Sequence, residues 1–283
     1  MATNVCDQII DEKFIIARVE TFDQYLNVLR KNKLDFQSDP PILFRGQNKN
    51  WPLYASLARL WCAGKFKNYN YKKTEKSMFD EFKCGANGWI AGELSDWDWL
   101  ALAQHYKLPT KLLDWSEDPF VALWFALWES KEENSVVWVF QPKRRWFLLP
   151  NVDRSLLSPF SSGKAEFWVV RRDRPCPFFR TIAFKPNYNI YNIRLRRQFG
   201  CFVLHEYISD ENGFISLNEH KTFNKGLKSI EINTNSGSRL EILNELNKYG
   251  INEKTMFYKF DFDEHLEELT KKIRNKYSED SKN

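Results

Sequence analysis

The sequence contains no segment that could cross a membrane and no signal for secretion. No apolar run approaches the roughly 20 residues that a transmembrane helix needs. The N-terminal stretch MATNVCDQIIDEKF carries acidic residues where a secretory signal needs a long apolar run. We therefore expect a cytoplasmic protein with no membrane partner.

Cysteine and histidine are both scarce. The five cysteines are widely spaced and form no CxxC pair, so they indicate neither a disulfide framework nor a zinc site. The four histidines form no HExxH motif, and the P-loop, GxGxxG and GxSxG motifs are missing too. These absences argue against kinases and metal hydrolases, and we expect no bound metal.

What the chain does have is enough apolar side chain for a large core. Of its 283 residues 43% are hydrophobic and 16% are aromatic, which is enough to fill a core and line a cleft. The net charge is only +5, but basic residues are dense at 143–145, 171–174 and 194–197. Such clusters admit a phosphate-bearing partner, although they more often lie in solvated turns and helix ends.

Hydrophobic periodicity, caps and breakers predict alternating helices and strands. The expected helices are 21–30, 71–91, a segment from 97, the apolar PFVALWFALWE after Asp118, SRLEILNELNKYGI and DFDEHLEELTKKI. The expected strands are 42–44, 110–115, 135–141, 165–170, 178–184, 199–205 and 228–232.

No internal repeat or flexible linker divides the chain, so we predict a single α+β domain. Its sheet is expected to be mixed and mostly antiparallel, with helices on its flanks. The predicted boundaries are an N-terminal lead-in at 1–20, the domain at 21–270 and a frayed tail at 271–283. We expect Phe44, Leu112 and Leu113 to be buried together with the face of the apolar helix formed by Val121, Leu123, Phe125 and Ala126.

Three blocks of sequence resemble the FRG-domain family, which is named for its Phe-Arg-Gly tripeptide. The first block is Ile42–Gln47 with Trp51, Leu53 and Arg59, and it contains the tripeptide as Phe44-Arg45-Gly46. The second is Ala101–Ala126, and the third is Arg194–Glu206 followed by a stretch that ends at Ile251. This resemblance covers about residues 21–270 and implies a module found in bacteria and mobile elements.

The same blocks are similar to the arginine-class ADP-ribosyltransferase plan. That plan has a strand ending in Tyr-Arg-Gly, a strand with Ser or Thr running into a helix, and a late strand with Glu. Phe44-Arg45-Gly46 matches the first element, and Leu112–Ser116 resembles the second, with Asp114 in the place of a hydroxyl. At the late strand the sequence departs from the plan, because Gln198 or Gly200 stands where the glutamate would be.

The resemblance implies an ADP-ribosyltransferase-like core that uses NAD. The candidate catalytic residues are Arg45, His105, Asp114 and Gln198, and the candidate NAD-binding residues are Arg45, Gly46, Gln47, Tyr106, Thr110 and Ser116. We expect Arg45, His105 and Asp114 to converge in one cleft. Trp51 and Trp115 are the tryptophans most suited to stacking on a planar ligand.

Most of these residues also have a structural interpretation. Arg45 is either a phosphate clamp or half of an ion pair with Asp114. His105 is either a substrate or proton-transfer residue or a core histidine that bonds local backbone. Thr110 either contacts the ligand or caps the turn after Pro109, and Gln198 either reads a base or ribose or ends a helix.

The leading hypothesis is an ADP-ribosyltransferase-like enzyme that modifies a nucleic acid or a protein. The expected setting is phage defence or a toxin, with an antitoxin as a possible partner protein. The alternative is a non-catalytic module that recognises a nucleotide or a nucleic-acid end in the same cleft. RNA cleavage by His105 with Arg45 is a third, minor option.

Overall fold

A computed structural model describes most of the chain. The described residues are 12–34, 41–65, 71–90, 94, 96–130, 134–141, 160, 169–170, 197–204, 207–209, 213–220, 223–257 and 263–279. In this part of the chain no helix has both the length and the apolar character needed to cross a bilayer.

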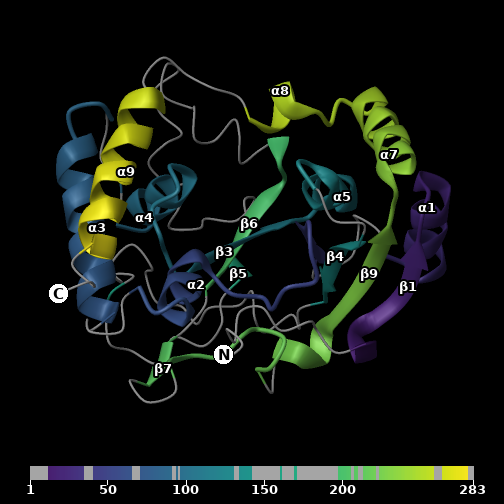
Figure 1. The fold of residues 1–283 in the computed structure, drawn as a ribbon, viewed down its shortest axis with the longest axis horizontal. Helices are drawn as coiled ribbons and strands as arrows, with labels where there is room; N and C mark the ends of the chain where they lie inside the picture. The colour runs from purple at the N-terminus through teal and green to yellow at the C-terminus, as the bar shows by residue number, and fades with distance from the viewer. Residues whose placement is uncertain are drawn as a thin grey trace.

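Seven strands form one sheet in the order β1-β9-β4-β2-β3-β6-β5 (Figure 1). They are β1 (Ile15–Val19), β2 (Leu43–Gln47), β3 (Leu112–Ser116), β4 (Asn134–Phe140), β5 (Val169–Val170), β6 (Gly200–Leu204) and β9 (Leu227–Asn233). A separate pair is formed by β7 (Tyr207–Ser209) and β8 (Gly213–Phe214). Among the described pairs only β1 with β9 is parallel, so the predicted mixed, mostly antiparallel sheet is confirmed.

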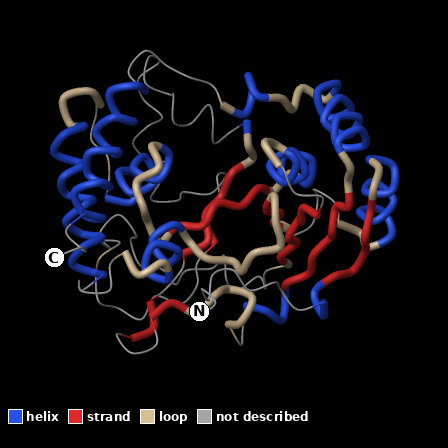
Figure 2. Tube along the Cα trace, viewed as in Figure 1, coloured by secondary structure: helices blue, strands red, loops and turns tan. Residues whose placement is uncertain are grey.

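Helices lie around the sheet, as Figure 2 shows in blue against the red strands. They are α1 (Phe22–Lys31), α2 (Ser56–Cys62), α3 (Tyr71–Ala86), α4 (Asp96–His105), α5 (Pro119–Leu127), α7 (Ser236–Lys248), α8 (Glu253–Met256) and α9 (Asp263–Glu279). α1 and α7 lie beside the β1 and β9 edge, whereas α3 and α9 pack together at the opposite end (Figure 1).

The element boundaries differ from the expected ones at both ends of the chain. β1 lies within the expected lead-in, where it pairs with β9 at the edge of the sheet. α9 continues to Glu279, so most of the expected frayed tail is helical. The strand expected at 178–184 lies outside the described residues.

The core consists of three buried clusters. One lies under α5 and contains Phe44, Val121, Leu123 and Ala126, with Phe125 partly buried against it. The prediction that Leu112 and Leu113 join this cluster is wrong, because both are buried in other clusters. Neighbouring residues of a strand point to opposite faces of the sheet, so these two leucines cannot share one cluster.

α5 begins where its sequence predicts and packs closely on β2. The Asp118 carboxylate caps the helix by accepting hydrogen bonds from the backbone N–H groups of Phe120 and Val121, at 2.7 and 3.3 Å, and Pro119 occupies the first turn. Burial raises the pKa of Asp118, and these two N–H groups partly offset that rise. The cap sets the direction of α5 over the strand that carries Arg45.

Candidate functional site

The site lies where the middle of the sheet opens. β2 pairs with β4 over five residues, but it pairs with β3 only at Phe44 and Ser116. A continued antiparallel ladder would place Gly46 opposite Asp114, and no such pair forms. The two strands therefore diverge after Phe44, and Arg45 is the first residue of β2 beyond the last β2–β3 pair.

The Arg45 side chain bridges this opening. Its Nη1 donates to the backbone carbonyl of Asp114 at 2.5 Å, and its Nε is buried without a hydrogen-bond partner among the described residues. Burial lowers the pKa of the Arg45 guanidinium to about 10, a shift that the Asp114 carboxylate opposes and Arg59 increases. The group remains charged at neutral pH, because a pKa of about 10 lies well above 7.

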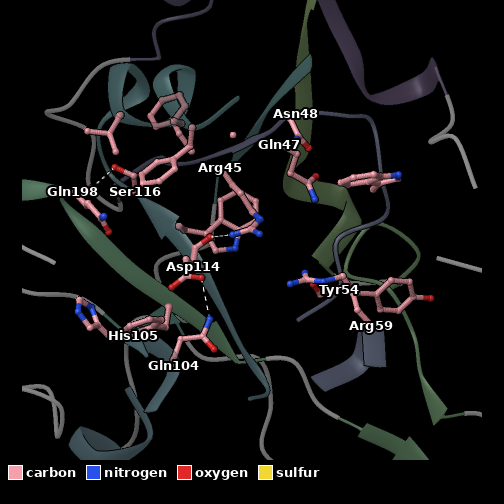
Figure 3. Close-up of a pocket in the computed structure, with 18 of the residues that line it drawn as sticks. Arg45, Gln47, Asn48, Tyr54, Arg59, Gln104, His105, Asp114, Ser116 and Gln198 are labelled. Atoms are coloured by element: carbon pink, nitrogen blue, oxygen red, sulfur yellow. Dashed lines mark hydrogen bonds between the residues drawn. The ribbon is translucent and has the colours of Figure 1, made fainter. Parts of the chain in front are cut away.

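A pocket of about 530 Å³ surrounds this bridge (Figure 3). Ligand sites in proteins commonly measure roughly 300 to 1,000 Å³. The predicted site residues that line it are Arg45, Gly46, Gln47, His105, Asp114, Ser116 and Gln198, together with Trp51 and Trp115. The expected convergence of Arg45, His105 and Asp114 is therefore observed, since β2, α4 and β3 deliver them to one cavity.

Asp114 does not form an ion pair with Arg45, which was one of the two interpretations of Arg45 from the sequence. Its Oδ2 accepts a hydrogen bond from Gln104 Nε2 at 3.0 Å, while Arg45 bonds the backbone oxygen of the same residue. Asp114 is exposed to the cavity. The carboxylate is thus oriented by an amide and is accessible to a ligand.

Ser116 and Gln198 join β3 to the turn before β6 (Figure 3). The Ser116 hydroxyl donates to the Gln198 carbonyl at 2.6 Å and accepts from the Asp118 N–H at 2.9 Å. The Gln198 amide donates to the Met256 carbonyl at 2.9 Å. Both side chains line the pocket, but their hydrogen bonds already hold neighbouring segments together.

Two predicted ligand residues are absent from the described lining of the pocket. Tyr106 is buried, and its hydroxyl donates to Asp263 Oδ1 on α9 at 2.7 Å. Thr110 is also buried; its hydroxyl accepts from the Leu112 N–H at 3.1 Å, as expected of a residue that caps a turn. The structure therefore gives both residues a role in the framework around the site.

Gly46 is required by packing against α5. A Cβ at this position would lie 1.9 Å from the Ala122 carbonyl oxygen and 2.5 Å from the Ala126 nitrogen. The glycine of the tripeptide, which was predicted to bind NAD, thus lets the backbone of a helix come close to β2.

Gln104 and Arg59 are among the polar residues that line the pocket without a site role predicted from the sequence. Gln104 lies in the second FRG block, and its contact with Asp114 depends on the meeting of α4 and β3. Arg59 lies on α2, and its guanidinium donates to the Tyr54 carbonyl at 2.6 Å. Its place in the first FRG block was the signal that could have identified it.

Most residues of the three basic clusters lie outside the part of the chain that the structure describes. Residues 143–145 and 171–174 lie outside the described residues, and of the third cluster only Arg197 is included. Within the described ranges no three His, Cys, Asp or Glu side chains gather as a metal site would require.

Comparison with known proteins supports one of the two resemblances. A family model, the FRG domain, matches residues 40–135, a range that spans β2, α2 to α5 and the first residues of β4. No curated protein and no solved structure matches the chain. The match includes Arg45, Gln104 and Asp114, and it carries no statement about chemistry.

Proposed function

We propose that the pocket binds NAD and that the chain is an ADP-ribosyltransferase-like enzyme acting on a nucleic acid or a protein. The observation that carries this proposal is the Arg45 guanidinium at the opening between β2 and β3. Among the described residues, its hydrogen-bond acceptor is one neutral carbonyl, and its Nε has no partner. A guanidinium in this setting forms strong, charge-assisted hydrogen bonds with an anion that offers two oxygens, and the pyrophosphate of NAD is such an anion.

The order of the strands supports the same proposal. The elements that resemble the transferase plan correspond to β2, β3 and the turn leading into β6. The strands β2, β3 and β6 are neighbours in the sheet, although β6 begins far along the chain from β3. Residues from all three strands or their ends line the pocket.

The proposed reaction needs a carboxylate beside the ribose. The bond between ribose C1′ and the nicotinamide nitrogen breaks, and its electron pair leaves with nicotinamide. An acceptor nucleophile then bonds to C1′ and loses its proton. Positive charge develops on the ribose during this step, and Asp114, the one carboxylate among the described lining residues, is suited to stabilise it.

A second candidate function is a recognition module that binds a nucleotide without turnover. It is favoured by the lack of a glutamate at the late strand, where Gln198 or Gly200 stands instead, and the Gln198 amide donates to the Met256 carbonyl. RNA cleavage has less support, because His105 is the one histidine in the described lining and a second proton-transfer histidine is lacking there. A role in phage defence or as a toxin with an antitoxin remains a prediction from the family resemblance.

The test is incubation of the purified full chain with NAD, alone and with RNA, DNA or protein acceptors. We expect free nicotinamide and a mass increase on one class of acceptor. Asp114→Asn should slow nicotinamide release by about a hundred-fold, because it removes charge stabilisation in the transition state. Asp80→Asn, which alters an exposed ion pair on α3, is the matched control.

The outcomes separate the two candidates. NAD binding without nicotinamide release would favour the recognition module. The enzyme proposal would also fail if Asp114→Asn and the wild-type chain released nicotinamide at the same rate. If NAD neither binds nor reacts, both the cofactor and the transferase assignment are wrong.

A further inference from the structure

Gln104 lies at the end of α4 and reaches the strand that carries the proposed catalytic carboxylate. Its Nε2 donates to Asp114 Oδ2 at 3.0 Å, and the same nitrogen lies 3.4 Å from the Leu112 carbonyl. Figure 3 shows Gln104 below Asp114, with its amide directed toward the carboxylate. Gln104 is half-buried, so its contact with the carboxylate competes with water less than a surface contact would.

Thr110 determines which end of the Gln104 amide meets Asp114. The Thr110 hydroxyl donates to Gln104 Oε1 at 2.6 Å, and Thr110 Oγ1 itself accepts from the Leu112 N–H at 3.1 Å. Because the amide oxygen is bonded to the hydroxyl, its nitrogen is turned toward the carboxylate. The reverse orientation would place two acceptors, the amide oxygen and the carboxylate, against each other.

The backbone of Thr110 is itself fixed in place. Its N–H donates to Ser56 Oγ at 3.0 Å, and its carbonyl accepts from the Leu57 N–H at 3.1 Å at the start of α2. Thr110 is fully buried. The chain of hydrogen bonds therefore begins at a rigid point of the framework and ends at a carboxylate that is open to the cavity.

One oxygen of Asp114 remains available. Oδ2 is occupied by Gln104, and Oδ1 makes no hydrogen bond to the residues that the structure describes. A carboxylate with one oxygen held and the other open is suited to accept a hydrogen bond from a ligand hydroxyl. For a nucleotide ligand this hydroxyl belongs to the ribose.

We propose that Gln104 is a positioning residue, which holds the Asp114 carboxylate toward a ribose hydroxyl of the ligand, with Thr110 setting the orientation of the Gln104 amide. The identity of the ligand as NAD rests on the function proposed above. The positioning itself rests only on the contacts within the chain, so the two claims can be tested separately.

The test combines ligand-free crystal structures with NAD kinetics for the wild-type chain, Gln104→Leu, Thr110→Val and Thr110→Ser. We expect Asp114 to leave its wild-type position in Gln104→Leu and in Thr110→Val. Thr110→Ser retains the hydroxyl and should keep the wild-type arrangement. Thr270→Val removes a buried hydroxyl on α9, outside the lining of the pocket, and controls for the loss of a buried hydrogen bond.

With NAD, Gln104→Leu should raise KM or lower kcat by about ten- to a hundred-fold, the range expected when a hydrogen bond to a charged group is lost. Thr110→Val should show a smaller effect in the same parameter, and Thr110→Ser should behave as the wild-type chain. A purely structural role would lower Tm in both Thr110→Val and Thr270→Val while leaving the kinetic parameters of the folded fraction unchanged.

The proposal is overturned if Asp114 keeps its position in Gln104→Leu, whatever the kinetics show. It is also overturned if Asp114 moves while the binding and turnover of NAD stay at wild-type values. If the wild-type chain does not bind NAD but Asp114 moves in both variants, the positioning role is upheld and the proposed function fails.

Discussion

At the scale of single residues, Arg45 concentrates the electrostatic character of the site. A lysine at this position would keep the charge but lose the planar fork that bonds two phosphate oxygens. We therefore predict that Arg45→Lys weakens NAD binding almost as much as Arg45→Ala, by about ten- to a hundred-fold. Isothermal titration calorimetry with both variants measures the difference.

The structural alternative for Arg45 predicts a different result. If Arg45 serves only to bridge β2 and β3 through the Asp114 carbonyl, both substitutions should lower Tm and leave the affinity of the folded fraction unchanged. Arg18→Lys and Arg18→Ala are suitable controls, because Arg18 lies on β1, outside the lining of the pocket, with its charge paired to Glu12 and Glu231. A large loss of Tm with intact affinity would contradict the phosphate-clamp assignment.

At the scale of elements, the contact between α5 and β2 depends on Gly46. We predict that Gly46→Ala lowers the free energy of unfolding by at least about 1–3 kcal/mol, because the added Cβ overlaps backbone atoms of α5 that cannot move as a side chain would. Urea unfolding of the full chain measures this loss. The control is Gly88→Ala, where a Cβ meets no atom within 4 Å and the expected change is within about 0.5 kcal/mol. Equal stabilities of the two variants would mean that α5 shifts freely on the sheet.

The hydrogen bonds that connect β3 to the turn before β6 depend on Ser116. Ser116→Ala removes the donor to the Gln198 carbonyl and the acceptor for the Asp118 N–H, two bonds in a buried setting. We predict a loss of about 1–3 kcal/mol in unfolding free energy.

Amide hydrogen exchange should also become faster at Asp118 in Ser116→Ala, because its N–H loses its acceptor. Ser278→Ala, which removes a hydroxyl near the end of α9, should change neither quantity appreciably. An unchanged exchange rate of the Asp118 amide would show that the Ser116 hydroxyl does not stabilise the connection between β3 and this turn.

At the scale of the whole molecule, the stretch that matches the FRG model is not a complete folding unit. Residues 40–135 contain β2 and β3, but β4 begins only at Asn134 and the partner strands β6 and β9 lie later in the chain. The cluster under α5 also uses side chains of α1 and α7, which this stretch omits. An isolated 40–135 fragment would therefore keep only the single β2–β3 pair, and it would lose β6, the part of β4 that pairs with β2, and much of its core.

We predict that the 40–135 fragment does not fold cooperatively, whereas a 12–279 fragment retains the unfolding transition of the full chain. Circular dichroism during thermal unfolding and the dispersion of proton–nitrogen NMR spectra measure this difference. A well-dispersed spectrum for the 40–135 fragment would show that the matched stretch is an independent domain.

Much of this molecule could be predicted from the sequence alone. The helices at α1, α5 and α7 and the strands at β2, β3, β4, β6 and β9 correspond to expected segments, because caps, breakers and periodicity act over a few neighbouring residues. The gathering of Arg45, His105 and Asp114 was also predicted, since each polar residue interrupts sequence that is otherwise suited to burial.

Only the tertiary structure decided which segments meet. The strand order, the opening between β2 and β3, and the packing of Gly46 on α5 depend on contacts between residues distant in the chain. The hydrogen-bond partners around Asp114 also depend on such contacts, because Arg45 donates to the Asp114 carbonyl and Gln104 donates to its carboxylate. A sequence pattern specifies that a polar group needs a partner, but the partner is determined by which atoms the packed elements bring within hydrogen-bond distance.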